Sequence, residues 1–354
     1  MKGLLLYAET LETKMLSYND DWFDAFLKCA DLDWDQCNLA TKSWMSFLFR
    51  IRQYDIIVLL HSTNSNGNYV HPLLQKALLY RKGKVVLFVG NEYKLMPEKI
   101  RFIKIIEVDY VSSQLPLDTA EWLYGETSAK VVSVPHALNP EVFKPQTRFS
   151  DRLIDFGDRS ADYPLYLGDI DRNRVPEVLS RFEEMGLLVD SSRSADKRFD
   201  RAGWANFLNT CKATMTTEAG TSFLERDDRT RLAVNAFNKE KPEAGFDEIF
   251  QIFFAHYNNA VSGKTISPRH FDAIGTKTCQ IMFPGRFCDI LEKGKHYISL
   301  EQDLSNIREV IDMFQDRLYV ERMVANTYEY AMEQHTHRHR INKLLGTIYN
   351  SHNA

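Results

Sequence analysis

The N-terminal part of the chain alternates short apolar runs with amphipathic segments. Continuous apolar runs at residues 4–7, 55–61 and 84–90 have the length and composition of strands buried on both faces of a parallel sheet. Between these runs, residues 21–29 and 72–81 repeat apolar positions at helical spacing. Strands that alternate with helices in this order predict a doubly wound α/β layer.

The same alternation returns in the second half, after a polar segment around Pro145. We expect its first strand at residues 153–157, and residues 221–263 then break the rhythm with a charged run followed by an amphipathic one. That interruption predicts a helical insertion, and the end of the chain is again helical. We therefore expect three parts, which are residues 1–145, 146–325 and 326–354.

Polar residues follow directly after several of the expected strands. His61, Glu92 and His136 stand at such ends in the first half, and Gly157 and Arg159 do so in the second. Because ligands of parallel sheets bind at the carboxyl ends of the strands, these residues are candidates for binding. A glycine at position 157 would let a backbone approach a phosphate. Taken singly, each polar side chain is somewhat better explained as a strand-end cap.

The most informative stretch is ISPRHFDAIGTKTCQIMFP, residues 266–284. Ser267 caps helices well and the proline after it suits a first helical turn, so we expect a helix to start here. Arg269 and Asp272 then lie three positions apart on one face. A helix start and an arginine together attract a diphosphate, and a carboxylate one turn further accepts hydrogen bonds from ribose hydroxyls. Taken alone, the stretch is better explained as an ordinary capped helix with a surface ion pair.

Composition limits the classes of function. The 354 residues are 44% hydrophobic and 26% charged, values typical of folded proteins, and the net charge of −4 argues against a nucleic-acid partner. The five cysteines are scattered without a CxxC pair, which indicates reduced thiols in the cytoplasm. The apolar run near the start breaks at Glu9, and no run of about 18 apolar residues occurs, so we expect neither a signal peptide nor a membrane span.

The sequence lacks the other common catalytic and metal-binding patterns. His335, His337 and His339 are spaced by two, so a helix cannot bring all three rings to one face as metal ligands. Neither a GxSxG elbow nor a GxxxxGK[ST] loop occurs. The aromatic stretch 246–257 leaves peripheral membrane association open, although packing inside the insertion explains it better.

Sequence blocks in the second half resemble, in the right order, those of glycosyltransferases with the two-domain fold called GT-B. VVSVPHALNPEVFKP at 131–145 is similar to their interdomain connection, and SPRHFDAIGTKTCQIMF at 267–283 is similar to their R-x-F-E-A-x-A-x-G block. Residues 300–316 and 331–345 resemble the helix and the tail that follow. The resemblance is closest to the spore-maturation-protein-like branch of the group 1 glycosyltransferases.

This resemblance implies two Rossmann-like domains that face each other across a cleft, with a C-terminal helix that crosses back to the first domain. The first domain would bind the acceptor and the second the donor. Asp272 stands where the family has the second Glu of its E-x7-E motif, the residue that holds the nucleotide ribose. Position 264, where the first Glu belongs, is a lysine, so Glu218 becomes the candidate donor-loop acid.

The function that the resemblance implies is transfer of a sugar from a nucleoside diphosphate sugar to a glycan or small-molecule acceptor. We expect retention of configuration and neither a metal nor another cofactor. Glu92 would be the general base if the enzyme inverts and would hold the sugar if it retains. An epimerase of nucleotide sugars and a non-catalytic scaffold stay open as alternatives. The candidate catalytic residues are Glu218, His61 and Glu92, and the candidate donor-binding residues are Gly157, Arg159, Lys264, Ser267, Arg269 and Asp272.

Overall fold

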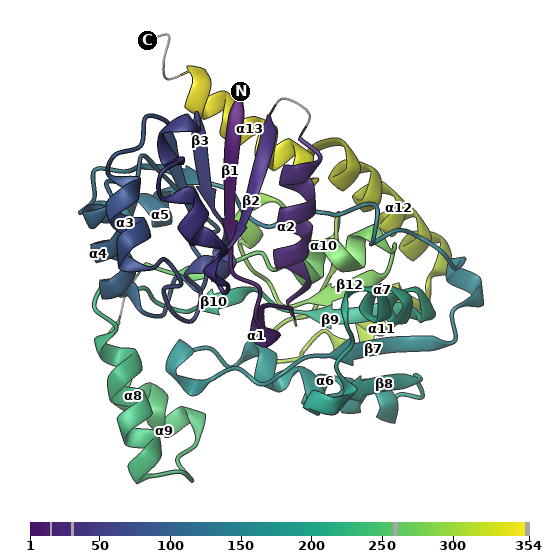
Figure 1. The fold of residues 1–354 in the computed structure, drawn as a ribbon. Helices are drawn as coiled ribbons and strands as arrows, with labels where there is room; N and C mark the ends of the chain where they lie inside the picture. Colours follow the sequence, from purple (N-terminus) through teal and green to yellow (C-terminus); the bar gives the residue numbers. More distant parts are fainter. Residues whose placement is uncertain (15, 30–31, 258–260, 351–354) are drawn as a thin grey trace.

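The computed structural model describes residues 1–14, 16–29, 32–257 and 261–350, which build two parallel sheets flanked by helices (Figure 1). The first sheet has six strands in the order β2-β1-β3-β4-β5-β6, and the second has five in the order β13-β12-β9-β7-β8. Strand pairs within both sheets are parallel. The expected fold class, two Rossmann-like domains, is therefore confirmed.

The elements of the first domain agree with most of the apolar pattern. Its strands are β1 (Lys2–Tyr7), β2 (Asp33–Asn38), β3 (Ile56–Leu59), β4 (Lys84–Phe88), β5 (Tyr110–Ser113) and β6 (Lys130–Ser133). Its α-helices are α1 (Leu11–Lys14), α2 (Ser17–Leu27), α3 (Pro72–Leu78), α4 (Met96–Ile105) and α5 (Leu117–Tyr124). Strand β2 was not expected from its sequence, because it forms the polar edge of the sheet and only Cys37 within it is buried.

The elements of the second half also follow the expected alternation. Its strands are β7 (Ile154–Arg159), β8 (Val189–Ser192), β9 (Cys211–Thr216), β12 (Cys279–Met282) and β13 (Ile298–Ser299), with a separate antiparallel pair of β10 (Ala219–Thr221) and β11 (Gly263–Thr265). Its helices are α6 (Asp171–Glu184), α7 (Arg201–Thr210), α8 (Arg229–Glu240), α9 (Phe246–Phe253), α10 (Pro268–Gly275), α11 (Ile307–Gln315), α12 (Arg317–Gln334) and α13 (His337–Asn350).

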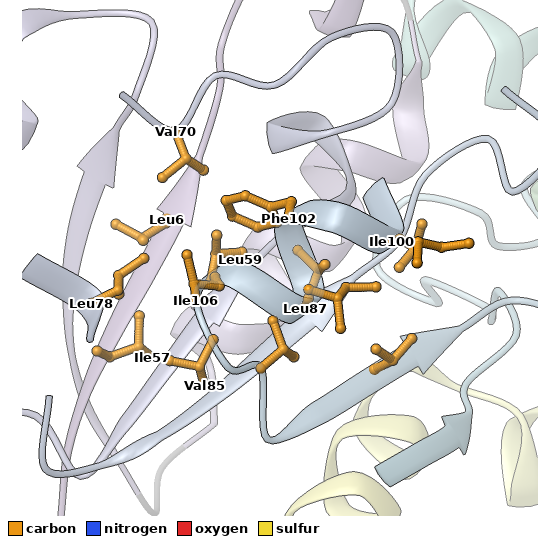
Figure 2. Packing of buried hydrophobic residues seen from close by; sticks show 14 of the residues in the cluster. Leu6, Ile57, Leu59, Val70, Leu78, Val85, Leu87, Ile100, Phe102 and Ile106 are labelled. Atoms are coloured by element: carbon orange, nitrogen blue, oxygen red, sulfur yellow. The ribbon is translucent and has the colours of Figure 1, made fainter. Parts of the chain in front are cut away.

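Each face of the first sheet carries its own hydrophobic core. On one face, side chains of β1, β3 and β4 pack against α3 and α4, and Figure 2 shows Leu6, Ile57 and Leu78 among them. On the other face, Leu5 and Trp22 pack against Ile341 and further apolar residues of α13. The C-terminal helix therefore crosses back to the first domain, as the resemblance implied (Figure 1).

The insertion between β10 and β11 forms a helical hairpin that projects from the body of the protein (Figure 1). Val234 of α8 and Ile249 of α9 meet in a small hydrophobic cluster, which Phe254 completes. Phe250 and Phe253 pack against this cluster and are partly buried. The aromatic residues of the stretch 246–257 therefore pack largely within the insertion.

The start of the insertion contacts the first domain. Leu224 belongs to the hydrophobic core on the α3 and α4 side of the first sheet. The Asp228 carboxylate accepts hydrogen bonds from the backbone N–H groups of Leu95 and Met96, at 2.6 and 3.2 Å. These N–H groups have no partner inside α4, so a residue of the second half caps a helix of the first.

A buried arginine holds together the segment where the second sheet begins. Arg152 is 3% exposed and forms no ion pair with a described carboxylate. Its guanidinium donates instead to the carbonyl oxygens of Cys211 and Thr276, at 2.9 and 2.6 Å. Further acceptors of the same group are the carbonyls of Thr147 and Lys277 and the Thr278 hydroxyl. Arg152 thus joins the linker, β9 and the turn after α10.

Candidate functional site

A cavity of about 390 Å³ lies between the two domains. Its first-domain wall carries aromatic, amide and hydroxyl side chains, among them Tyr18, Asn91, Tyr93 and Gln114. Its second-domain wall is rich in arginine and comes from the loop after β7 and from the first turns of α6, α7 and α10. Such a cavity is the default position for a ligand in a protein of two facing domains.

Apart from the exposed Arg198, two arginines on the second-domain wall have no carboxylate partner among the described residues. They are Arg172 in the first turn of α6 and Arg269 in the first turn of α10. The Arg172 guanidinium stacks on the Tyr163 ring at 3.8 Å from its centroid. Burial, and next the charge of Arg172, lowers the pKa of Arg269 to about 10. Two neighbouring cations in a partly buried wall favour an anionic ligand.

The start of α10 is built as its sequence predicts. Ser267 is the N-cap, and its backbone N–H donates to His270 Nδ1 at 3.0 Å in a capping box. Arg269 and Asp272 follow in this helix, and Ser267, Arg269 and Asp272 all line the cavity. The Trp204 indole donates to Asp272 Oδ2 at 3.0 Å and fixes the orientation of the carboxyl. Burial, and next the charge of Asp21, raises the pKa of Asp272 well above its ordinary value.

Arg159 lines the cavity, but its guanidinium also contacts Asp190 and Phe207 within the second domain. Its guanidinium donates to Asp190 Oδ1 at 2.6 Å and lies 4.4 Å from the centroid of the Phe207 ring. Gly157, two residues earlier, lies within β7 and away from the cavity. A Cβ at this position would come within 2.3 Å of Cys211 Sγ, so packing alone explains the glycine.

Lys264 and Glu218 lie close to each other but do not line the cavity. The Lys264 ammonium lies 2.5 Å from Oδ2 of the buried Asp169, so this ion pair neutralises its charge. The Glu218 carboxylate accepts a hydrogen bond from the Phe287 backbone N–H at 2.7 Å, and burial raises its pKa. Their neighbours Gly220 and Gly263 reach the cavity wall. The donor-site roles predicted for Lys264 and Glu218 stay predictions.

Glu92 lies on the first-domain wall with both carboxylate oxygens occupied. Oε1 accepts from the Ser113 and Tyr124 hydroxyls, both at 2.7 Å, and Oε2 accepts from the Gln114 backbone N–H at 2.8 Å. Burial raises the pKa of Glu92, while these donors act in the opposite direction. The arrangement ties three segments of the first domain together and fixes the orientation of the Glu92 carboxyl.

His61 is buried behind the wall, in a group of rings at the carboxyl ends of β3 and β6. Its ring centroid lies 5.7 Å from that of His136 and 5.8 Å from that of Trp22. Neither nitrogen of His61 has a hydrogen-bond partner among the described residues, and the same holds for His337. Burial lowers the pKa of both rings to about 3, so each is neutral at neutral pH.

The buried neutral state of His61 predicts sensitivity to acid. Its pKa lies far below the value near 6.5 of an unfolded chain, so only the unfolded state gains a proton as the pH falls below 6.5. This one ring should cost about 2 kcal/mol of the free energy of unfolding between about pH 7 and pH 5. Urea unfolding at both pH values should therefore show a smaller acid loss for His61→Leu than for the wild type. The exposed His256→Leu variant should keep the full loss.

Several cavity residues were not found from the sequence. Arg172 follows Gly168 in the run GDIDRNR, a glycine-then-basic pattern that could have drawn attention to it. Tyr163 lies in an irregular loop, so no periodicity marks it. Tyr18 and Gln114 have no local signal, because their role depends on how α2 and the end of β5 face the other domain.

The described residues also limit two other classes of site. Among them, no group of three or more His, Cys, Asp or Glu side chains could hold a metal ion. No helix in the described parts of the chain is long and apolar enough to cross a membrane.

Comparison with known proteins identifies the fold. Neither a protein-family model nor a curated protein matches the chain. Crystal structures of Anabaena HepE are similar over 99% of this chain and 100% of theirs: the complex with UDP at 9% identity and a TM-score of 0.52, and the complex with UDP and glucose at 11% and 0.50. The phage T4 enzyme BGT with UDP-glucose matches 98% of this chain and 99% of its own at 12% identity and a TM-score of 0.49. The likeness to HepE establishes the GT-B arrangement of the two domains and nothing finer.

Proposed function

We propose that the protein transfers a sugar from a nucleoside diphosphate sugar to a hydroxyl group of a glycan or small-molecule acceptor. The observation that carries this proposal is the pair of unpaired guanidinium groups, Arg172 and Arg269, on the second-domain wall of the cavity. A diphosphate would offset both charges and would meet the N-terminus of α10. The HepE structures, which share the fold, hold UDP, in one case together with glucose.

The donor's remaining parts would contact groups beside the arginines. Asp272, held by the Trp204 indole, stands one turn into α10 and would accept hydrogen bonds from ribose hydroxyls. The acceptor would then lie against the first-domain wall, where Tyr18, Tyr93 and Gln114 offer ring faces and polar groups to a sugar. This division assigns the donor to the second domain and the acceptor to the first.

The reaction that we propose retains configuration. The acceptor oxygen bonds to the anomeric carbon on the face that the diphosphate leaves, the carbon–oxygen bond to the diphosphate breaks, and the acceptor proton passes to a diphosphate oxygen. Arg172 and Arg269 would stabilise the negative charge on the leaving group, so the proposal needs no metal. Three donors within the first domain hold the Glu92 carboxylate, so the proposal gives Glu92 a positioning role and not that of a general base.

Product analysis tests this proposal. The protein is incubated with UDP-, GDP- and TDP-sugars and a panel of glycan and small-molecule acceptors, and products are followed by mass spectrometry and NMR. We expect nucleoside diphosphate release together with a glycosylated acceptor of the donor's anomeric configuration, at a rate that EDTA leaves unchanged. A changed sugar still attached to nucleotide would identify an epimerase instead. Absence of both turnover and nucleotide binding would leave the scaffold alternative.

A further inference from the structure

One stretch of the first domain has a charge that the rest of the chain does not share. Between residues 39 and 91, Asp55 is the only acidic residue, whereas seven residues are lysine or arginine. The stretch therefore has a formal charge of 7 − 1 = +6, and the remainder of the chain has −4 − 6 = −10. A concentration of cations in an acidic protein points to an anionic partner.

This stretch covers a single face of the first sheet. It contains the connection from β2 to β3, with the short helices η1 (Lys42–Phe47) and η2 (Ile51–Gln53), and the connection from β3 to β4, with α3. Inner residues of both connections, such as Phe47 and Leu78, share one hydrophobic core. The Trp44 and His71 rings stack at 4.4 Å between centroids, so η1 lies directly beside the start of α3.

The outer side of these two connections exposes large apolar side chains. Phe49 is 93% exposed and Tyr80 is 72% exposed, and about half of Met45 and of Leu73 is exposed as well. A phenylalanine this exposed is unusual in a folded domain, because its whole ring loses contact with other apolar groups. Four such side chains on one face favour a surface that is covered when the protein functions.

Exposed cations lie among these apolar side chains. Lys42, Arg52, Lys76 and Lys82 are exposed, and none forms an ion pair with a described residue. Other basic residues of the stretch are already neutralised, since Arg81 and Lys84 pair with Asp109. The four exposed charges are therefore available to a partner.

We propose that this face, made of Met45, Phe49, Leu73, Tyr80, Lys42, Arg52, Lys76 and Lys82 and called here the docking face, rests on an anionic membrane surface. Cations reach lipid phosphates while isolated aromatic and aliphatic side chains enter the interface between headgroups and acyl chains. A protein partner would be better matched by a contiguous apolar centre with charges at its rim. Here cations and apolar residues are interleaved along the sequence, in the order Lys42, Met45, Phe49, Arg52 and then Leu73, Lys76, Tyr80, Lys82. The stretch 246–257, for which packing within the insertion is the better explanation, is not part of this proposal.

Vesicle cosedimentation tests the docking face independently of any glycosyl transfer. The full-length protein is mixed with vesicles of phosphatidylcholine alone or of phosphatidylcholine with phosphatidylglycerol, at low and high salt. We expect it to sediment with the anionic vesicles only and to be released by salt. Phe49→Ser and the double variant Lys76→Glu, Lys82→Glu should each reduce the bound fraction about fivefold or more.

Leu153→Ser is the matched control, because Leu153 is 81% exposed but stands directly before β7 of the second domain, outside the docking face. It should bind vesicles like the wild type, and all variants should keep the wild-type melting temperature because the exchanged side chains are exposed. Absence of binding to anionic vesicles at low salt, or an equal loss in Leu153→Ser, would overturn the proposal. Self-association that Phe49→Ser abolishes, without vesicle binding, would instead identify an interface between protein copies.

Discussion

Replacing Arg269 by alanine should lower kcat/KM for the sugar donor by about 10²- to 10³-fold, and the affinity for the nucleoside diphosphate should fall with it. The reason is that Arg269 lies beside Arg172, and neither guanidinium has a carboxylate partner among the described residues. Arg198 is also unpaired on this wall, but it is exposed to solvent. The Arg269→Lys variant keeps the charge but loses the planar fork, so we expect it to recover only part of the activity.

The control for this prediction comes from the same helix as Arg172. Arg174 lies two residues further along α6, where it approaches Glu177 at 3.9 Å and does not line the cavity. Arg174→Ala should leave both turnover and calorimetric affinity for UDP within about twofold of the wild type. If Arg269→Ala binds UDP as the wild type does, the diphosphate is not held where we place it.

The second large effect concerns stability. Arg152→Met removes five hydrogen bonds from a buried position and leaves several carbonyl oxygens, among them those of Cys211 and Thr276, without a donor. Each buried acceptor left unsatisfied costs about 1–3 kcal/mol, so the free energy of unfolding should fall by at least about 3 kcal/mol. Thermal unfolding followed by fluorescence and urea titration both measure this loss.

Arg148→Met provides the comparison, since Arg148 is an exposed arginine only four residues earlier in the same linker. Its replacement should change the free energy of unfolding by less than about 0.5 kcal/mol. Equal stability of the two variants would mean that water replaces the Arg152 guanidinium without cost and that the linker does not depend on it.

The sequence predicts the fold where a strand is buried on both faces. The apolar runs that became β1, β3 and β4 need no information from elsewhere, because burial on both sides requires continuous apolar sequence. The sequence does not predict helix α4, because its start depends on a residue far away in the chain. It begins after Leu95, which has a positive φ of 57°, and its cap is Asp228, more than a hundred residues further along the chain.

In the candidate site, too, the residues that local sequence patterns mark could be predicted, and those that depend on contacts distant in sequence could not. Ser267, Arg269 and Asp272 could be found because helix capping and a spacing of three operate within one turn. For Arg172 the sequence offers only the glycine-then-basic run before it, because its position next to Arg269 comes from the adjacency of two helix starts that follow different strands. The donor-site roles of Lys264 and Glu218 stay predictions from their order in the sequence. In the structure Lys264 contacts Asp169 and Glu218 accepts from the Phe287 backbone, contacts that no local pattern indicates.

The cap that Asp228 places on α4 makes the first half depend on a residue of the second, which limits how the two halves can be exchanged. GT-B proteins invite the exchange of donor halves to obtain new specificities, since each half has its own sheet. Here two residues of the second half complete the first: Leu224 packs in its hydrophobic core, and Asp228 caps helix α4. A chimera joined at the linker would lose both, so a working graft has to carry the root of the insertion along with the N-terminal half.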